Sequence, residues 1–200
     1  MKKLLLLCSI SFAMLVSAQN YNLPAASPRQ TITQQISISN VSVDYGRPAV
    51  KGRTIFGDLV PFGKVWRAGA NGSTKLTFGQ DMMFGGKLVK KGTYGLFIIP
   101  NAKEWEIILN QDADGWGAYA YDEKKNVASA KAVVISNVEP QEWFKIDLED
   151  LSENGLTMAF AWDRTRVSVP LTIANADAVS QIKTKLKELT KINDEMNKKK

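Results

Sequence analysis

Histidine is absent from the 200-residue sequence, and cysteine occurs once, as Cys8. Without histidine the chain has no Ser-His-Asp triad and no haem or zinc ligation by imidazole. Without a second cysteine it has no intramolecular disulfide, so it tolerates an oxidising compartment without mispairing. These absences leave carboxylate, lysine and tyrosine side chains as the acids and bases that remain for catalysis.

The first segment has the features of a secretory signal peptide. A basic start over residues 1–3 precedes an apolar run over residues 4–16, which is too short for a membrane span. Small residues follow, which predicts cleavage after Ala18 and a mature chain without cysteine. We therefore expect residues 1–18 to be a signal peptide of an exported protein, periplasmic or extracellular, with no transmembrane segment. The alternative is a short buried N-terminal helix.

The positive charge of the chain is concentrated at its end. The formal net charge is +6, yet residues 19–182 hold 17 basic and 17 acidic side chains, and the excess lies in a lysine-rich tail. A nucleic-acid-binding protein would carry basic residues across one binding face of a recognisable fold. We therefore expect no nucleic-acid partner.

Alternation of apolar and polar residues dominates the middle of the chain. Residues 19–29 carry two prolines and small polar residues, which indicates an extended leader. Over residues 30–174, short alternating runs are separated by turn signals, with no segment long enough for a crossover helix. The pattern predicts a single all-β domain, an antiparallel β-sandwich or jelly roll with about eight to ten strands. It also predicts a turn at residues 163–166 and an edge strand around Pro170.

One stretch, which we call the arginine segment (residues 46–72), breaks this alternation. It holds six glycines, five basic residues and one acid. Irregular connections longer than about 15 residues are uncommon in compact domains and often carry function. Arginines there can offer planar donors to a carboxylate, phosphate or sugar hydroxyl, and a tryptophan can offer a stacking face. The candidate ligand-binding residues are Arg47, Arg53, Trp66, Arg67 and Asn71.

Three functions are compatible with this segment. The favoured one is a non-catalytic binding module for a small anionic or polyhydroxylated, glycan-like ligand. The first alternative is a structural or partner-docking domain in which the segment is internal packing, with Arg47 paired to Asp44 and Trp66 plugging an end of the sandwich. The second is a carboxylate-based hydrolase. The carboxylates available for such a pair are Asp44, Asp112, Asp114, Asp147 and Asp163.

The remaining motifs predict no cofactor, no metal site and no catalytic residue. Between Gly57 and Gly63 there are five residues where a phosphate loop needs four. Residues 110–115 begin like a calcium loop, but Tyr121 stands where the bidentate glutamate is required. A plain Asx turn ahead of Trp116 is the favoured interpretation.

Several blocks resemble the signature of the domain of unknown function 2911 family. They are YGRP (45–48), GRTIFG (52–57), LVPFG (59–63), VWRAGAN (65–71), GTYGLF (92–97), WGAY (116–119) and WDRTRV (162–167). The resemblance covers residues 25–174. It implies an exported bacterial protein and no settled activity.

Residues 175–200 are expected to form a lysine-rich amphipathic helix, capped by Asn175 or Asp177. The apolar residues at heptad spacing are Val179, Ile182, Leu186, Leu189 and Met196, with Asn193 in the remaining seam position. A lone helix of this length frays in water unless the stripe packs. Docking on the flank of the sandwich is favoured. The alternatives are a homodimer through the helix, a frayed tail, and attachment to an anionic surface.

Overall fold

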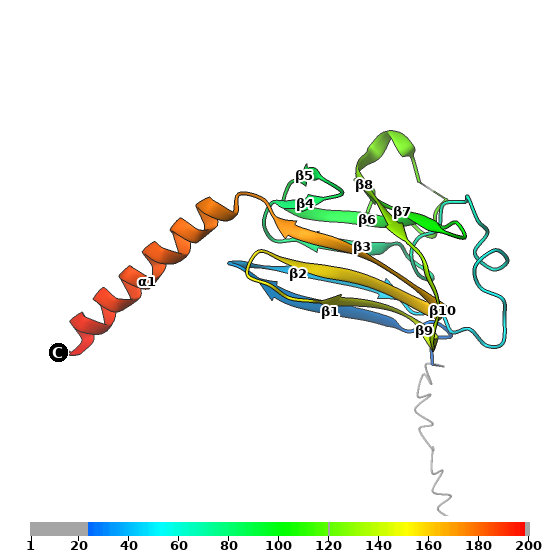
Figure 1. Cartoon of the computed structure of the whole chain (residues 1–200), viewed down its shortest axis with the longest axis horizontal. Coiled ribbons are helices and arrows are strands. Elements are labelled where there is room, and N and C mark those ends of the chain that lie inside the picture. The colour runs from blue at the N-terminus through cyan, green and yellow to red at the C-terminus, as the bar shows by residue number, and fades with distance from the viewer. Residues whose placement is uncertain (1–23, 120, 199–200) are drawn as a thin grey trace, which may run out of the picture.

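Two antiparallel sheets form the body of the protein, and a helix extends from it (Figure 1). The computed structural model describes residues 24–119 and 121–198, so the predicted signal peptide and the start of the leader lie outside the described residues. The six-stranded sheet contains, in order, β1 (Arg29–Ile36), β2 (Ser39–Gly46), β3 (Thr74–Phe78), β6 (Gly92–Ile99), β7 (Glu104–Asn110) and β8 (Asn126–Val133). The four-stranded sheet contains β5 (Lys87–Val89), β4 (Met82–Phe84), β10 (Gly155–Ile173) and β9 (Ile135–Glu149). The predicted all-β sandwich with a C-terminal helix is confirmed.

The core lies between the two sheets, because alternate side chains of each strand point to the same face. In β2, Val41, Val43 and Tyr45 are fully buried, while the residues between them are half-exposed. Phe144 and Ile146 of β9 face them from the other sheet, and the hydroxyl of Tyr45 bonds to the main chain of Ile146. Strand β1 lies along β9, and β8 lies along β4, β5 and β10. The two sheets are thus close at both edges.

The second face of the six-stranded sheet is also covered in part. Phe97 of β6 and Ile108 of β7 are buried although they point away from the sandwich core. The loop that follows β7 packs on them, and the ring of Tyr121 lies 5.0 Å from that of Phe97. Asn110 holds this loop, because its Oδ1 accepts from the N–H of Asp112 at 2.9 Å. This is the predicted Asx turn.

The predictions for β10 need correction. Residues 163–166 form no turn, because β10 runs without interruption from Gly155 to Ile173. Register shifts against β9 flank Asp163, whose φ is 52°. A bulge therefore absorbs the turn-forming residues within a long strand. Pro170 lies in a central strand rather than an edge strand, but the pairing of β10 with β9 ends at Arg166 and that with β4 begins at Leu171.

Helix α1 (Ala176–Lys198) points away from the sandwich in Figure 1. Only Val179 of its stripe is buried, whereas Ile182, Leu186, Leu189, Ile192 and Met196 are exposed. The expectation that this stripe docks on the flank of the sandwich is therefore wrong. The tail is joined to the body through little more than its first turn and the Lys183–Glu153 ion pair. Among the described residues, no helix combines the length and apolar character needed to cross a membrane.

Tyr45 links the two sheets, and its buried phenol makes the stability of the protein depend on pH in the alkaline range. Its hydroxyl accepts from the Ile146 N–H at 3.0 Å and lies 3.0 Å from Gln30 Oε1. Burial raises the pKa of this phenol above its ordinary value of 10.0. The native state therefore retains the proton at a pH where the unfolded chain loses it, so this contribution to stability falls as the pH rises through 10 and beyond.

We expect Tyr45→Phe to lower the free energy of unfolding by about 1–3 kcal/mol at pH 7, because buried hydrogen bonds are lost. The difference in free energy of unfolding between wild type and variant should become smaller between about pH 10 and 11, because phenylalanine has no proton to lose. Urea unfolding of both proteins at these two pH values measures this difference. Tyr94 and Tyr121, whose pKa values are also raised by burial, are present in both proteins, so their contributions cancel in the difference. A gap that stays constant with pH would contradict this account.

Candidate ligand-binding pocket

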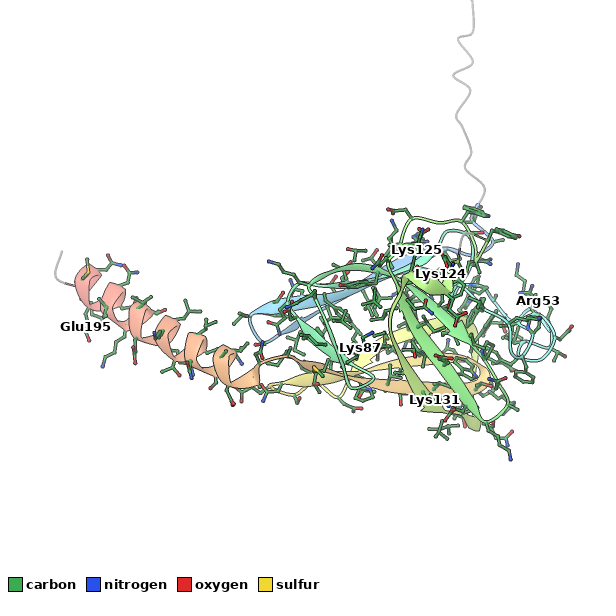
Figure 2. All side chains as sticks on the ribbon, turned by 90° about the horizontal axis from the view of Figure 1, so that it is seen from above. Arg53, Lys87, Lys124, Lys125, Lys131 and Glu195 are labelled. Carbon is green, nitrogen blue, oxygen red and sulfur yellow. The ribbon has the colours of Figure 1, made fainter. Side chains whose placement is uncertain are left out.

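The arginine segment connects β2 to β3 at the end of the sandwich opposite α1, where Figure 2 labels Arg53. Trp66 fixes the segment to the core. Its main chain exchanges two hydrogen bonds of 2.8 Å with Ile98 of β6, and its Nε1–H donates to the carbonyl of Gly69 at 3.0 Å. Its ring lies stacked on Trp162, with centroids 5.8 Å apart. The segment is thus an ordered part of the sandwich and not a linker.

A tight turn follows Trp66. Ala68 has φ of 50°, in the left-handed region that alanine seldom adopts, and Asn71 has φ of 64°, which asparagine tolerates. The turn is held from inside, because Thr74 Oγ1 donates to the carbonyl of Ala68 at 2.8 Å. Gly46 allows its close approach, since a β-carbon at that position would lie 2.2 Å from the carbonyl oxygen of Ala70. Backbone strain of this kind concentrates at functional sites.

This turn forms one wall of a pocket of about 280 Å³, which we call the arginine pocket. Four of the five predicted residues line it, namely Arg53, Trp66, Arg67 and Asn71. Its other walls are Ser27, Pro48, Leu59, Val60, Gly69, Ala70 and Trp162. The structure therefore brings most of the predicted set to one concavity at the end of the sandwich.

Arg67 is the unusual member of the set. It is half-buried, and its Nε is enclosed without an acceptor anywhere in residues 24–119 and 121–198. Within the same residues it forms no ion pair. Burial lowers the pKa of Arg67, since desolvation disfavours the charged form. A guanidinium in this state gains from any acceptor that enters the pocket.

The other arginines of the segment are satisfied by the main chain. Arg47 does not line the pocket, and its Nε donates to the carbonyl of Phe144 at 3.0 Å. It does not pair with Asp44, which is bound to Arg29 at 2.8 Å. Arg53 is exposed at the rim and donates to the carbonyls of Val50 and Ala49. Asn71 is also exposed, and its Nδ2 lies 3.4 Å from the carbonyl oxygen of Ser27.

Trp66 lies in the pocket wall without forming an exposed rim, since only 8% of it is accessible. It belongs to an aromatic cluster with Trp162, Phe144 and Phe56. Trp162 lines the pocket as well, although it was not among the predicted site residues. Its Nε1–H is buried and, within the described part of the chain, has no acceptor. Two residues that line the pocket thus each have an enclosed N–H without an acceptor, although neither of these two atoms is accessible from the pocket.

Paired carboxylates for hydrolysis are not brought together here. No residue that lines the arginine pocket is acidic. Four of the five candidates are in ion pairs: Asp44 with Arg29, Asp112 with Lys125, Asp114 with Lys75, and Asp147 with Lys145. In residues 24–119 and 121–198, no three acidic, histidine or cysteine side chains cluster in a way that could hold a metal ion.

A larger groove of about 740 Å³ runs beside the free edge of β8. Its walls are main chain and small side chains around the Gly85–Gly86 turn, with Pro170 and Thr172 of β10. Lys131 is the one charged residue that lines it, and this lysine pairs with Glu104 at 3.1 Å. Because the one charged side chain that lines this groove is already paired, the arginine pocket is the stronger candidate despite its smaller volume.

Comparison with known proteins places the chain in a family. Residues 27–171 match the model of the family described as protein of unknown function (DUF2911), and the chain belongs to this family. No curated protein and no solved structure matches the chain. The match spans the strands of both sheets and the whole arginine segment, and it ends before α1.

The different states of Arg67 and Arg47 predict opposite effects on stability. We expect Arg67→Met to leave the free energy of unfolding unchanged or to raise it by up to about 1 kcal/mol, because an uncompensated, partly buried charge is removed. Arg47→Met should lower it by about 1 kcal/mol, since it removes a hydrogen bond. Urea unfolding of the two unliganded variants measures these changes. If Arg67→Met were as destabilising as Arg47→Met, Arg67 would have a structural role and the binding assignment would lose its support.

Proposed function

We propose that this protein is a non-catalytic binding module that holds a small anionic or polyhydroxylated ligand in the arginine pocket. The observation that carries the proposal is Arg67, which lines the pocket half-buried, with no ion-pair partner and no acceptor for its Nε among the described residues. Buried polar groups are normally hydrogen-bonded, and leaving one unsatisfied costs about 1–3 kcal/mol. The Nε itself is enclosed, so a ligand oxygen would bond to the accessible part of the same guanidinium, which lines the pocket, and would offset the desolvation of its charge.

The shape and chemistry of the pocket support a small ligand. Its volume of about 280 Å³ lies at the low end for ligand sites, which suits one sugar ring or a small organic acid. Arg67, Asn71 and Arg53 supply charged and neutral donors around one concavity. Carboxylates, phosphates and vicinal hydroxyls are the acceptors that such donors recognise.

The two alternative functions receive less support. A purely structural role accounts for most of what Arg47, Arg53 and Trp66 do, because all three donate to main-chain carbonyls. It does not account for Arg67, whose Nε has no acceptor among the described residues. A hydrolase would need two carboxylates at a cleft, and the arginine pocket is lined by none.

We further propose that the protein acts outside the cytoplasm, in the periplasm or the cell exterior. The support is the basic start, apolar run and small residues of the first 18 positions, which lie outside the described residues. Such a location suits a mature chain without cysteine.

Tryptophan fluorescence offers a direct test, because Trp66 and Trp162 both line the pocket. Glucuronate, citrate, inorganic phosphate and glucose would be titrated into the mature protein at millimolar concentrations. We expect at least one to perturb the emission and to raise the melting temperature. Arg67→Met should weaken that probe about tenfold or more, which is the value of a hydrogen bond to a charged group.

Arg164→Met is the matched control, since Arg164 is an exposed arginine outside the pocket. It should bind the probe as the wild type does. If none of the probes shifts either the emission or the melting temperature, the binding proposal is wrong. Equal weakening in both variants would indicate a general charge effect and would also contradict it.

We also propose that α1 self-associates. Its exposed apolar residues recur at heptad spacing, with Asn193 in the seam. Isolated helices are marginal in water, and this one gains little from the sandwich because Val179 is its only buried residue. A second copy would cover the stripe without any change in the body.

Deletion of residues 176–200 tests this second proposal. In light scattering we expect the full mature chain to have twice the mass of one copy and the truncated chain to be a monomer. The melting temperature of the truncated chain at low protein concentration should stay within a few degrees, because the deleted residues bury almost nothing on the sandwich. A full chain that is already monomeric at 100 µM would refute self-association.

A further inference from the structure

Two exposed aromatic residues lie beside the arginine pocket. Trp116 is 66% exposed and Tyr119 is 90% exposed, in the loop between β7 and η1 (Glu123–Lys125). Large aromatic side chains are usually buried, so two of them at this degree of exposure in one short loop call for an explanation. Neither residue takes part in any aromatic pair of the described structure.

The loop that carries them is fixed to the pocket wall. The N–H of Gly117 donates to the carbonyl of Asn71 at 3.1 Å, and the N–H of Ser73 donates to that of Gly115 at 3.0 Å. The hydroxyl of Ser73 adds a bond to the Gly115 carbonyl at 2.8 Å. Trp116 itself forms an antiparallel bridge with Gly72. The aromatic residues are therefore held by main-chain pairing to the turn that contains Asn71.

Arg67 adjoins the same loop. A β-carbon on Gly117 would lie 3.8 Å from Arg67 Nη1 and 3.0 Å from the ring of Tyr119. The guanidinium and the tyrosine ring therefore both border the space that a side chain at position 117 would fill. Asp114, the acid of this loop close to the aromatics, is paired with Lys75. The surface that joins the pocket to the aromatics therefore offers donors and ring faces.

We propose that the arginine pocket and the Trp116–Tyr119 loop form one extended site for an acidic oligosaccharide. The carboxylate of one uronic acid unit accepts hydrogen bonds from Arg67, and the next sugar ring places its C–H face on the aromatic side chains. This inference rests on the proposed function, since it assigns an anion to the same pocket. It adds the class of ligand and the second subsite.

A glycan ligand explains the pairing of a polar pocket with exposed aromatic residues better than a protein partner does. A sugar acid has a carboxylate, hydroxyls and an apolar ring face within the span of two units, which matches donors and aromatic faces set side by side. A stable protein interface buries at least about 1,000 Å² and has a continuous apolar centre. Two aromatic side chains beside a polar pocket provide neither that area nor a continuous apolar centre. Because main-chain bonds hold the loop in place, ordering it on binding costs little.

Isothermal titration calorimetry with trigalacturonate, galacturonate and neutral maltotriose tests the proposal. We expect the acidic trimer to bind the mature protein at least tenfold more tightly than the acidic monomer, and maltotriose to bind more weakly than either. Trp116→Ala and Tyr119→Ala should each weaken the trimer about threefold to tenfold, the value of one aromatic contact, and leave the monomer unchanged. Arg67→Met should weaken both acidic probes.

Phe62→Ala is the matched control, because Phe62 is an exposed aromatic residue that does not line the arginine pocket. It should bind all probes as the wild type does. If the monomer binds and the trimer is no tighter, the extended site is wrong while the proposed function stands. If the aromatic variants weaken monomer and trimer equally, the second subsite is also wrong. If neither acidic probe binds but phosphate or citrate does in the fluorescence titration, the pocket takes an anion and the glycan assignment fails.

Discussion

The packing of Trp66 between the two sheets fixes the stretch of backbone, residues 66–71, that forms one wall of the arginine pocket. Its ring is stacked on Trp162 at an interplanar angle of 18°, and Phe144 lies 5.0 Å away. Its main chain pairs with Ile98 as a short strand would. Trp66 is buried in the core, and the residue that follows it, Arg67, is half-buried, and both line the same pocket. Anchoring of Trp66 in the core therefore also fixes the backbone that carries the guanidinium.

The crossing of two backbone segments at Gly46 closes the pocket from the other side. The Ala70 N–H donates to the carbonyl of Gly46 at 3.3 Å, a contact that any side chain at position 46 would prevent. Left-handed backbone at Ala68 and Asn71 then turns the chain back toward β3. For Ala68 this conformation costs of order 1–3 kcal/mol, which its surroundings must offset. The aromatic cluster and the Thr74–Ala68 hydrogen bond are the contacts that hold this turn.

Much of the fold follows from short-range patterns, and the limits of prediction have physical causes. Alternation identified β2, β6 and the strands around them, because one face of each must be apolar. The same patterns misjudged residues 163–166, since a bulge and a turn use the same residue types and only tertiary pairing separates them. The sequence could not show that Arg67 is unpaired while Arg47 is satisfied. The carbonyl that accepts from Arg47 belongs to Phe144, which is far along the chain. Trp116 and Tyr119 stood in a recognised block, but their exposure depends on how that loop crosses β3.

The contrast among the arginines bears on why the pocket has its composition. Arg47 and Arg53 show that main-chain carbonyls were within reach of guanidinium groups in this segment. An unsatisfied Nε at Arg67 is therefore no general consequence of a crowded, glycine-rich loop. A chain under selection for stability alone would place methionine or leucine there, since an apolar side chain of similar size has no desolvation cost. A costly, unpaired donor at this position is what selection for ligand binding at the expense of stability would produce. Arg67 lies beside the turn at Ala68 and next to the loop of Trp116 and Tyr119, and this juxtaposition at one end of the sandwich is the reason to test that end for a ligand.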